Sequence, residues 1–162
     1  MKKTIKFLLN LFAVLSLLLN FSFVYAAGTS DNSKKYSSLY KEGKKLVIKA
    51  KKLEKKNKIE KAKQLYLKAF DKLEKAYEKD KKNADILNYL GFTLRKTGDL
   101  EKAESFYLKG LDLDAGHLGI NEYLGELYVQ TNRIELAKER LEVLNGCKCE
   151  EYKELKELIE NN

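Results

Sequence analysis

Two cysteines separated by a single residue, Cys147 and Cys149, are the only thiols in this chain of 162 residues. Cysteines of an exported protein are expected to be oxidised, and a bond between these two would close a very small ring. They form a candidate disulfide that could pin a turn, although their pairing with each other stays open. A strained disulfide is an oxidising one, so a thiol redox protein using this pair is one functional hypothesis. The Cys-x-x-Cys spacing of redox domains is absent.

The remaining residues give little indication of a metal site or of a hydrolytic active site. A metal site at the cysteine pair would need two further ligands, and His117 is the only histidine. A lone histidine at a boundary between repeated segments is typical of a surface or packing residue. The sequence has no glycine-rich phosphate loop, no Ser/His/Asp set, and no carboxylate pair distinguished from the other acidic residues. We therefore predict no enzyme, no metal and no cofactor.

The N-terminal segment has the pattern of a secretory signal peptide. Three lysines within the first six residues precede an apolar run over 7–24, and the small residues Val24 and Ala26 flank Tyr25. We predict a signal peptide over 1–26, a flexible linker over 27–35, and export to the periplasm or the extracellular space. The alternative is an uncleaved segment that anchors the protein in the membrane, because about 18 apolar residues can span a bilayer.

The net charge of +8 is unevenly distributed along the chain. Residues 34–82 carry 19 lysines and 7 acidic residues, whereas residues 83–162 carry 10 basic and 16 acidic residues. An exported protein does not meet cytosolic nucleic acid, so we expect no nucleic-acid partner. Anionic envelope polymers, lipid headgroups or acidic protein surfaces are better partners for the basic half. The opposite signs of the two halves also permit self-association.

The segment 84–117 carries a helical pattern on either side of a turn. Apolar and small residues recur at spacings of three and four, and Gly98-Asp99 separates the two runs. The residues that make up the pattern are Leu87, Leu90, Gly91, Leu94, Ala103, Tyr107 and Gly110. They predict two amphipathic helices packed as a hairpin. The pattern resembles the tetratricopeptide repeat, whose first helix packs a small residue and whose second helix packs an alanine and an aromatic residue.

Two further segments carry the same pattern. Ala103 and Ala137 lie 34 residues apart, whereas Ala62 and Ala103 lie 41 apart, seven more than one repeat. Seven residues make about two helical turns, so the insertion is expected to lengthen a helix and to preserve its apolar face. The resemblance implies an all-α, right-handed α-solenoid of tetratricopeptide-like hairpins. The predicted segments are a domain over 36–162, an extended repeat at about 43–83, repeats at 84–117 and 118–146, and a capping helix over 150–161.

The resemblance also implies a binding module, because such stacks hold a peptide or protein in a concave groove built from the first helices. Helix phase places eight residues on this groove, namely Val47, Lys51, Asn88, Phe92, Arg95, Glu122, Glu126 and Val129. Phe92 falls off the core stripe of its own helix, and we expect it to be an exposed anchor for the ligand. The other interpretation is that Phe92 packs against the neighbouring hairpin. The tyrosines on the core stripes, Tyr66, Tyr107 and Tyr128, are expected to pack.

Three functional hypotheses follow. The chain resembles small exported bacterial tetratricopeptide proteins, also in its tail Cys149-Glu150-Glu151-Tyr152. This resemblance implies a non-enzymatic protein–protein interaction scaffold of the bacterial cell envelope, which binds an unknown peptide or protein in its groove. The alternative is an envelope-associated structural or self-assembling protein that acts through its lysine-rich first repeat. The thiol redox protein is the third.

Overall fold

A computed structural model describes residues 29–162, and their side chains from Ser37 onward. The signal peptide expected over 1–26 lies outside these residues. The described chain is entirely helical apart from turns and loops. Its helices are α2 (Thr29–Glu54), α3 (Ile59–Tyr77), α4 (Ala84–Thr97), α5 (Leu100–Leu113), α6 (Leu118–Gln130), α7 (Ile134–Val143) and α8 (Glu150–Glu160). Between residues 29 and 162, none of these helices combines the length and the apolar run needed to cross a bilayer.

The chain divides into two units, residues 1–37 and residues 38–162. The described part of the first unit is the start of α2, which begins at Thr29. The expectation of a flexible linker over 27–35 is therefore wrong for most of that segment. Its residues are polar and small, but neither proline nor glycine interrupts the chain between Thr29 and Glu42, so a helix can continue through it.

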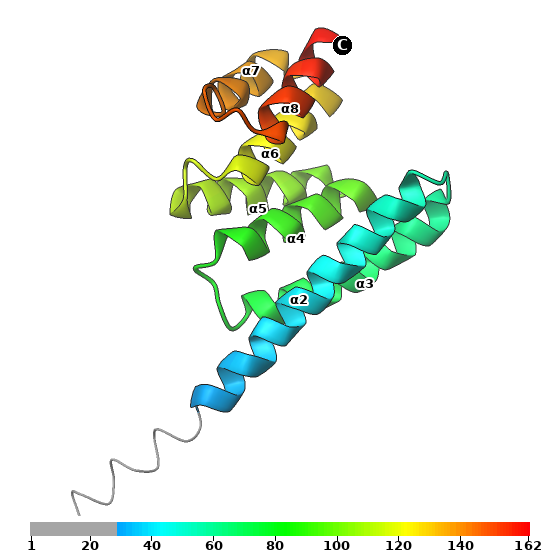
Figure 1. Ribbon diagram of the computed structural model, residues 1–162, viewed down its shortest axis with the longest axis vertical. Helices are drawn as coiled ribbons and strands as arrows, with labels where there is room; N and C mark the ends of the chain where they lie inside the picture. Colours follow the sequence, from blue (N-terminus) through cyan, green and yellow to red (C-terminus); the bar gives the residue numbers. More distant parts are fainter. Residues whose placement is uncertain (1–28) are drawn as a thin grey trace, which may run out of the picture. The chain divides into compact units, whose positions relative to one another are not determined.

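The second unit is a stack of helical hairpins (Figure 1). Helices α2 and α3, α4 and α5, and α6 and α7 form successive antiparallel pairs, and each pair packs against the next. Helix α8 packs against α6 and α7. The second unit is thus an all-α solenoid of tetratricopeptide-like hairpins.

Each hairpin turns through one residue with a positive φ angle. These residues are Asn57 (φ 53°), Gly98 (φ 103°) and Asn132 (φ 58°). Glycine and asparagine are the residues that adopt this left-handed conformation at least cost. The amide after each of them donates to a carbonyl five residues back, in the pairs Lys58–Leu53, Asp99–Leu94 and Arg133–Tyr128. The three turns therefore share one backbone geometry although their sequences differ.

The first hairpin accommodates its seven additional residues in two places. Helix α3 has 19 residues, against 14 in α5. The loop after α3 spans residues 78–83, whereas the loop after α5 spans residues 114–117. Five residues therefore lengthen the helix and two lengthen the loop, and Ala62, Tyr66, Ala69, Leu73 and Ala76 continue one buried face along α3.

The core is built by placing small residues against large ones. A methyl group at Gly91 would approach the ring of Tyr107, and one at Gly125 would approach the end of Leu155. Tyr66, Tyr107 and Tyr128 are buried, as the sequence predicts. Close packing of this kind allows neighbouring helices to approach without voids.

Helix α8 is anchored by Leu155, which is buried in the notch that Gly125 leaves in α6. The sequence pattern also places Leu158 on the inward face, and this expectation is wrong, because Leu158 is 39% exposed. Leu158 lies about 300° around the helix from Leu155, at the margin of the face that meets α6 and α7. Because α8 is covered on one side only, it buries a narrow stripe of side chains, and Leu158 lies outside that stripe.

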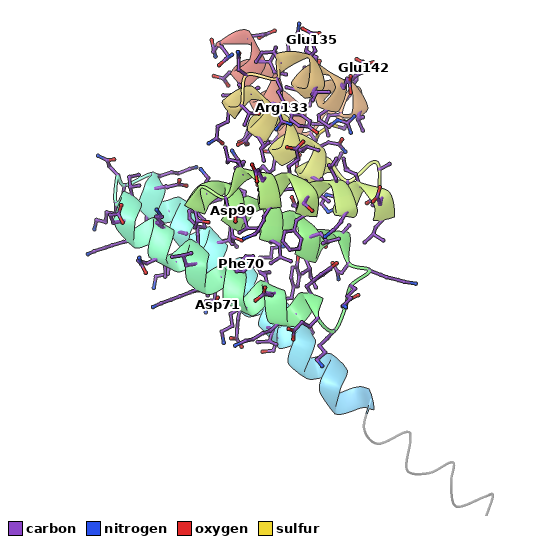
Figure 2. All side chains as sticks on the ribbon, turned by 180° about the vertical axis from the view of Figure 1, so that it is seen from behind. Phe70, Asp71, Asp99, Arg133, Glu135 and Glu142 are labelled. Carbon is purple, nitrogen blue, oxygen red and sulfur yellow. A yellow bond between two sulfur atoms is a disulfide. The ribbon has the colours of Figure 1, made fainter. Side chains whose placement is uncertain are left out.

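Polar contacts connect successive hairpins as well. Figure 2 labels Arg133 at the start of α7. Its two terminal nitrogens donate to the two carboxylate oxygens of Glu104 in α5, at 2.9 and 2.8 Å. Glu54 of α2 accepts from the hydroxyl of Tyr66 at 2.7 Å and from Nζ of Lys96 in α4 at 3.0 Å. These contacts fix each hairpin relative to the next in addition to the apolar core.

Candidate functional site

The first helices α2, α4 and α6 contribute side chains to one charged and aromatic cluster. Its members are Lys51, Phe92, Arg95, Tyr123 and Glu126, and we call it the α2–α4–α6 cluster. The rings of Phe92 and Tyr123 lie 4.8 Å apart between centroids. Nζ of Lys51 lies 5.4 Å from the first ring centroid and 5.6 Å from the second, and it donates to the hydroxyl of Tyr123 at 3.4 Å. Cations at this distance from aromatic faces are attracted to them.

Arg95 supplies the second cation of the α2–α4–α6 cluster, and its side chain is only 8% exposed. It forms an ion pair of 2.5 Å with Glu126, and its guanidinium carbon lies 5.6 Å from the ring centroid of Phe92. Burial disfavours the charge of Arg95, but Tyr107 and Glu126 beside it raise its pKa above the ordinary value. Within the cluster, the negative charge of Glu126 therefore balances the positive charge of Arg95.

Three carboxyl groups gather at the edge of the same cluster. Glu122 and Glu126 come from α6 and Glu154 from α8, and one oxygen of each lies within 4.8 Å of the others. Burial, together with a hydrogen bond to Glu154 and the charge of Glu126, raises the pKa of Glu122 to about 9. Glu122 is therefore protonated at neutral pH and can donate a hydrogen bond to Glu154.

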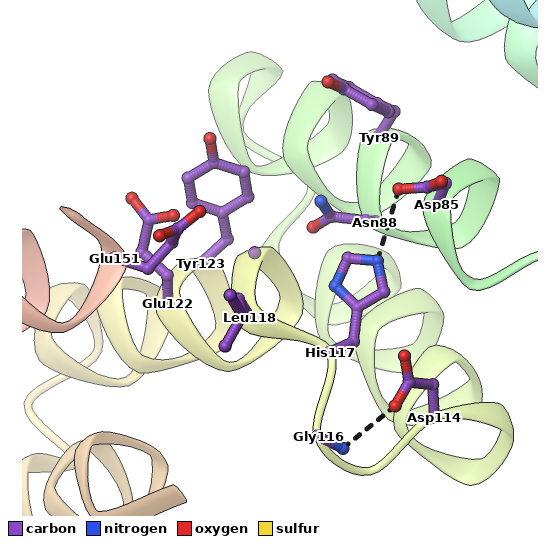
Figure 3. A pocket seen from close by; sticks show the side chains of 11 residues that line it. Asp85, Asn88, Tyr89, Asp114, Gly116, His117, Leu118, Glu122, Tyr123 and Glu151 are labelled. Atoms are coloured by element: carbon purple, nitrogen blue, oxygen red, sulfur yellow. Dashed lines mark hydrogen bonds and ion pairs between the residues drawn. The ribbon is translucent and has the colours of Figure 1, made fainter. Parts of the chain in front are cut away.

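A pocket of about 440 Å³ opens next to this carboxyl group, between α4, the loop after α5, and α6 (Figure 3). We call it the α4–α6 pocket. It shares Glu122 and Tyr123 with the groups described above. The other side chains that line it are Asp85, Asn88, Tyr89, Asp114, His117, Leu118 and Glu151.

His117 has a structural role at the rim of the α4–α6 pocket. It is the N-cap of α6, where its Nδ1 accepts a hydrogen bond from the backbone N–H of Ile120 at 3.2 Å. Because Nδ1 is the acceptor, the ring proton of the neutral imidazole is on Nε2, which lies 3.4 Å from a carboxylate oxygen of Asp85. The sequence prediction of a surface or packing residue missed this capping function, since histidine is not among the usual N-cap residues.

Replacing His117 with alanine is expected to lower the free energy of unfolding by about 1 kcal/mol, because α6 loses its capping acceptor. Asparagine offers a side-chain oxygen at a similar position, so His117→Asn should retain most of the stability. Urea denaturation followed by circular dichroism measures both variants. Equal losses in the two variants would contradict the capping role.

The structure corrects the expected exposure of several groove residues. Phe92 is only 2% exposed, and its ring packs edge-on against Tyr66 of α3, with centroids 5.7 Å apart. The expectation of an exposed aromatic anchor is therefore wrong, and the packing interpretation holds. Helix phase within one hairpin does not reveal a ring that the preceding hairpin covers. The predicted groove residues that are also buried are Val47, Asn88, Glu122 and Val129.

Lys51, Arg95 and Glu126 are partly accessible, and they meet in the α2–α4–α6 cluster. Sequence reasoning missed two aromatic residues beside them, Tyr89 and Tyr123. A signal was available, because these tyrosines are 34 residues apart and so occupy equivalent positions of two repeats. Neither lies on the core stripe of its own helix, and both pack partly against the core and line the α4–α6 pocket.

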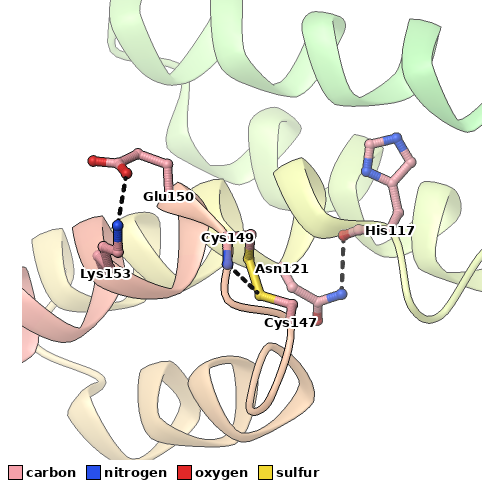
Figure 4. Close-up of a disulfide and its surroundings, with 6 residues drawn as sticks. All are labelled: His117, Asn121, Cys147, Cys149, Glu150 and Lys153. Atoms are coloured by element: carbon pink, nitrogen blue, oxygen red, sulfur yellow. Dashed lines mark hydrogen bonds and ion pairs between the residues drawn. A yellow bond between two sulfur atoms is a disulfide. The ribbon is translucent and has the colours of Figure 1, made fainter.

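The cysteine pair lies in the segment between α7 and α8 (Figure 4). The sulfur atoms of Cys147 and Cys149 are 1.93 Å apart, and the backbone N–H of Cys149 donates to Sγ of Cys147. This disulfide precedes the first turn of α8. The sequence contains no second cysteine pair.

Comparison with known proteins agrees with this architecture. Residues 72–105 match the family model of the tetratricopeptide repeat. A tetratricopeptide repeat protein from Parabacteroides merdae shares the fold with a TM-score of 0.53 and 16% identity, over 74% of this chain and 59% of that protein's chain. The present chain therefore spans less than two thirds of that relative.

Two other solved structures are less similar. The tetratricopeptide domain of Arabidopsis OM64 gives a TM-score of 0.49 at 14% identity, covering 76% of this chain and 98% of that one. The Yersinia enterocolitica type III secretion translocator chaperone SycD gives 0.49 at 16% identity, covering 73% and 81%. No curated protein matches the sequence. Residues 72–105 therefore carry a tetratricopeptide repeat, and the chain shares the fold of a tetratricopeptide repeat protein.

Proposed function

We propose that this protein is a non-enzymatic interaction scaffold that binds a peptide or protein segment on the face formed by α2, α4 and α6. One observation carries the proposal. Side chains from three hairpins meet in the α2–α4–α6 cluster, where Nζ of Lys51 reaches the hydroxyl of Tyr123, 72 residues away in sequence. Lysine and arginine side chains that serve only solubility point into water, whereas Lys51 and Arg95 lie over aromatic rings.

The composition of the cluster indicates the chemistry of its ligand. Lys51 presents an ammonium group beside a tyrosine hydroxyl, and both can bind carbonyl or carboxylate oxygens of an extended segment. The rings of Phe92 and Tyr123 pack against each other, and the ammonium group of Lys51 lies over both rings, which holds it in place. A site assembled from fixed side chains loses little conformational entropy when a ligand binds.

The test uses peptides selected on the purified protein from a random twelve-residue phage library in 0.5 M NaCl. Lys51→Ala should weaken binding of the selected peptides at least tenfold, because it removes a cation held over two rings. Lys52→Ala is the matched control, since the neighbouring lysine is exposed and lies outside the cluster. Its effect should be smaller than twofold. Equal effects of the two variants, or a failure to select any peptide, would contradict the proposal.

A second candidate function rests on the charge of the first hairpin. Exposed lysines along α3, among them Lys61, Lys68 and Lys75, recur every seven residues and so follow one side of the helix. Such a row suits anionic envelope polymers or lipid headgroups, or the acidic half of a second copy. Sedimentation with phosphatidylglycerol vesicles should then occur at low salt, fade in 0.5 M NaCl, and disappear when the three lysines are changed to glutamine.

The site of action is part of the same proposal. The signal peptide expected over 1–26 supports export to the periplasm or the extracellular space, where the disulfide of Cys147 and Cys149 would persist. An uncleaved membrane anchor remains the alternative. N-terminal sequencing of the protein recovered from the culture medium, the periplasm and the membranes distinguishes the two.

A further inference from the structure

The α4–α6 pocket differs from the neighbouring α2–α4–α6 cluster in its charge balance. Lys51 and Arg95 supply cations to the cluster, whereas neither lysine nor arginine lines the pocket within the described residues. The carboxylates of Asp85, Asp114 and Glu151 face it, together with the carboxyl group of Glu122. The pocket therefore presents hydrogen-bond acceptors and negative charge to whatever enters it.

Hydrogen-bond donors of the fold contact two of these carboxylates, those of Asp85 and Asp114. The Nε2 proton of His117 points at Asp85, at 3.4 Å. Asp114 accepts from the backbone N–H of Gly116 at 3.2 Å, within the same loop (Figure 3). Within the described residues, Glu151 takes part in no ion pair. A cation that enters the pocket would thus meet these carboxylates with neither lysine nor arginine among the described lining residues.

A buried amide gives independent support for a ligand. Asn88 lines the pocket, is only 6% exposed, and its Oδ1 has no hydrogen-bond partner among the described residues. Leaving a buried acceptor unsatisfied destabilises the folded state, so native proteins rarely keep one without a reason. Figure 3 shows this side chain reaching from α4 toward the space between Tyr123 and His117. An N–H donor in the pocket would satisfy it.

The arrangement suits an organic cation better than a metal ion. Within the described chain, the only acidic residues close enough together to share a metal ion are Glu122, Glu126 and Glu154, and Arg95 already pairs with Glu126. The carboxylates of Asp85, Asp114 and Glu151 do not belong to such a group. An ammonium or guanidinium group carries several N–H donors and can satisfy acceptors that are spread around a pocket.

We propose that the α4–α6 pocket binds the cationic side chain of a lysine or arginine from the segment that occupies the groove. This inference rests on the proposed scaffold function and adds a sequence preference to it. The pocket of about 440 Å³ is large enough to admit such a side chain. Tyr123 belongs both to the pocket and to the α2–α4–α6 cluster, so one extended segment can reach the two sites together.

The test compares two capped nonapeptides that differ only in the central residue. The first has the sequence Gly-Ser-Ala-Ala-Lys-Ala-Ala-Ser-Gly, and the second carries Nε-acetyl-lysine in place of lysine. Titration of the full protein, followed through the backbone amide resonance of Gly119, should show at least tenfold tighter binding of the lysine peptide. Equal binding of the two peptides, or no shift of Gly119 at millimolar peptide, would overturn the proposal without any variant being needed.

Two variants then locate the binding. Asp85→Asn combined with Glu151→Gln keeps the side-chain shapes and should weaken binding of the lysine peptide at least tenfold. Glu157→Gln on the exposed side of α8 is the matched control and should change it less than twofold. An equal loss in the control would show that the lysine peptide is attracted to the general negative charge of the surface, and it would overturn the proposal that the pocket binds it. If library peptides require Lys51 but show no preference at the pocket, the inference fails while the scaffold function stands.

The cation can come from another protein or from the lysine-rich hairpin of a second copy. Sedimentation velocity over a range of protein concentrations distinguishes these sources. If a second copy supplies the lysine, the wild-type protein should associate with rising concentration and the double variant should not. If both remain monomeric, the segment belongs to another protein.

Discussion

Gly91→Ala is expected to lower the free energy of unfolding by roughly 1–3 kcal/mol, although alanine is the better helix former. A methyl group at this position would lie 2.5 Å from one carbon of the Tyr107 ring and 2.7 and 2.8 Å from two others. Tyr107 is fully buried, so its ring cannot turn aside. Urea denaturation at constant pH measures the loss. Gly116→Ala is the control, because a methyl group there would meet no atom closer than 3.8 Å.

A double-mutant cycle separates this clash from a general effect on the helix. Combining Gly91→Ala with Tyr107→Leu should cost at least 1 kcal/mol less than the sum of the single changes, because the smaller side chain makes room for the methyl group. Additive losses would show that the cost at Gly91 does not arise from the ring.

Glu122→Gln is expected to stabilise the protein at alkaline pH and to leave its stability almost unchanged at pH 4. The folded protein holds the Glu122 proton up to a pKa of about 9, whereas the unfolded chain releases it near the ordinary value of 4.5. The folded state therefore binds more protons between these values, and the stability of the wild type should fall as the pH rises through this window. Glutamine carries no titrating proton, so the variant should lose this dependence.

The groups around Glu122 determine how large the effect is. Burial is the largest cause of the raised pKa of Glu122. Glu154 of α8 and Glu126 of α6 raise this pKa further, whereas Lys51 of α2 lowers it. We expect a gain of about 1–3 kcal/mol for Glu122→Gln at pH 8, measured by urea denaturation at several pH values. Glu157→Gln serves as the control and should follow the wild type. If the free energies of unfolding of Glu122→Gln and the wild type changed with pH in parallel, this would contradict a proton held by Glu122 in the folded protein.

The hairpin register could be predicted from the sequence because it depends on contacts within one repeat. Tyr107 meets Gly91 inside the same pair of helices, and the small residues of this pattern recur at a spacing of 34 residues, as in Gly91 and Gly125. The turns were also visible, since Asn57, Gly98 and Asn132 are residue types that adopt positive φ angles. Local propensity and helical period contain this information.

The site was less accessible to sequence reasoning because it depends on contacts between repeats. Phe92 appears exposed when only its own helix is considered, yet Tyr66 of the preceding hairpin covers it. The hydrogen bond between Glu122 and Glu154 likewise joins α6 to α8, whose relative position no helical period specifies. The α4–α6 pocket includes a loop and the cap of α6, and its shape follows from packing alone.

The contact between Lys51 and Tyr123 has a consequence for the order in which the molecule forms. Most packing here joins helices that are neighbours along the chain, and such local contacts close short loops and form quickly. Lys51 and Tyr123 are 72 residues apart, so their contact requires three hairpins to be in place. The α2–α4–α6 cluster should therefore be completed after the cores of the separate hairpins, and a nascent or partly folded chain should have a core before it has the proposed binding face.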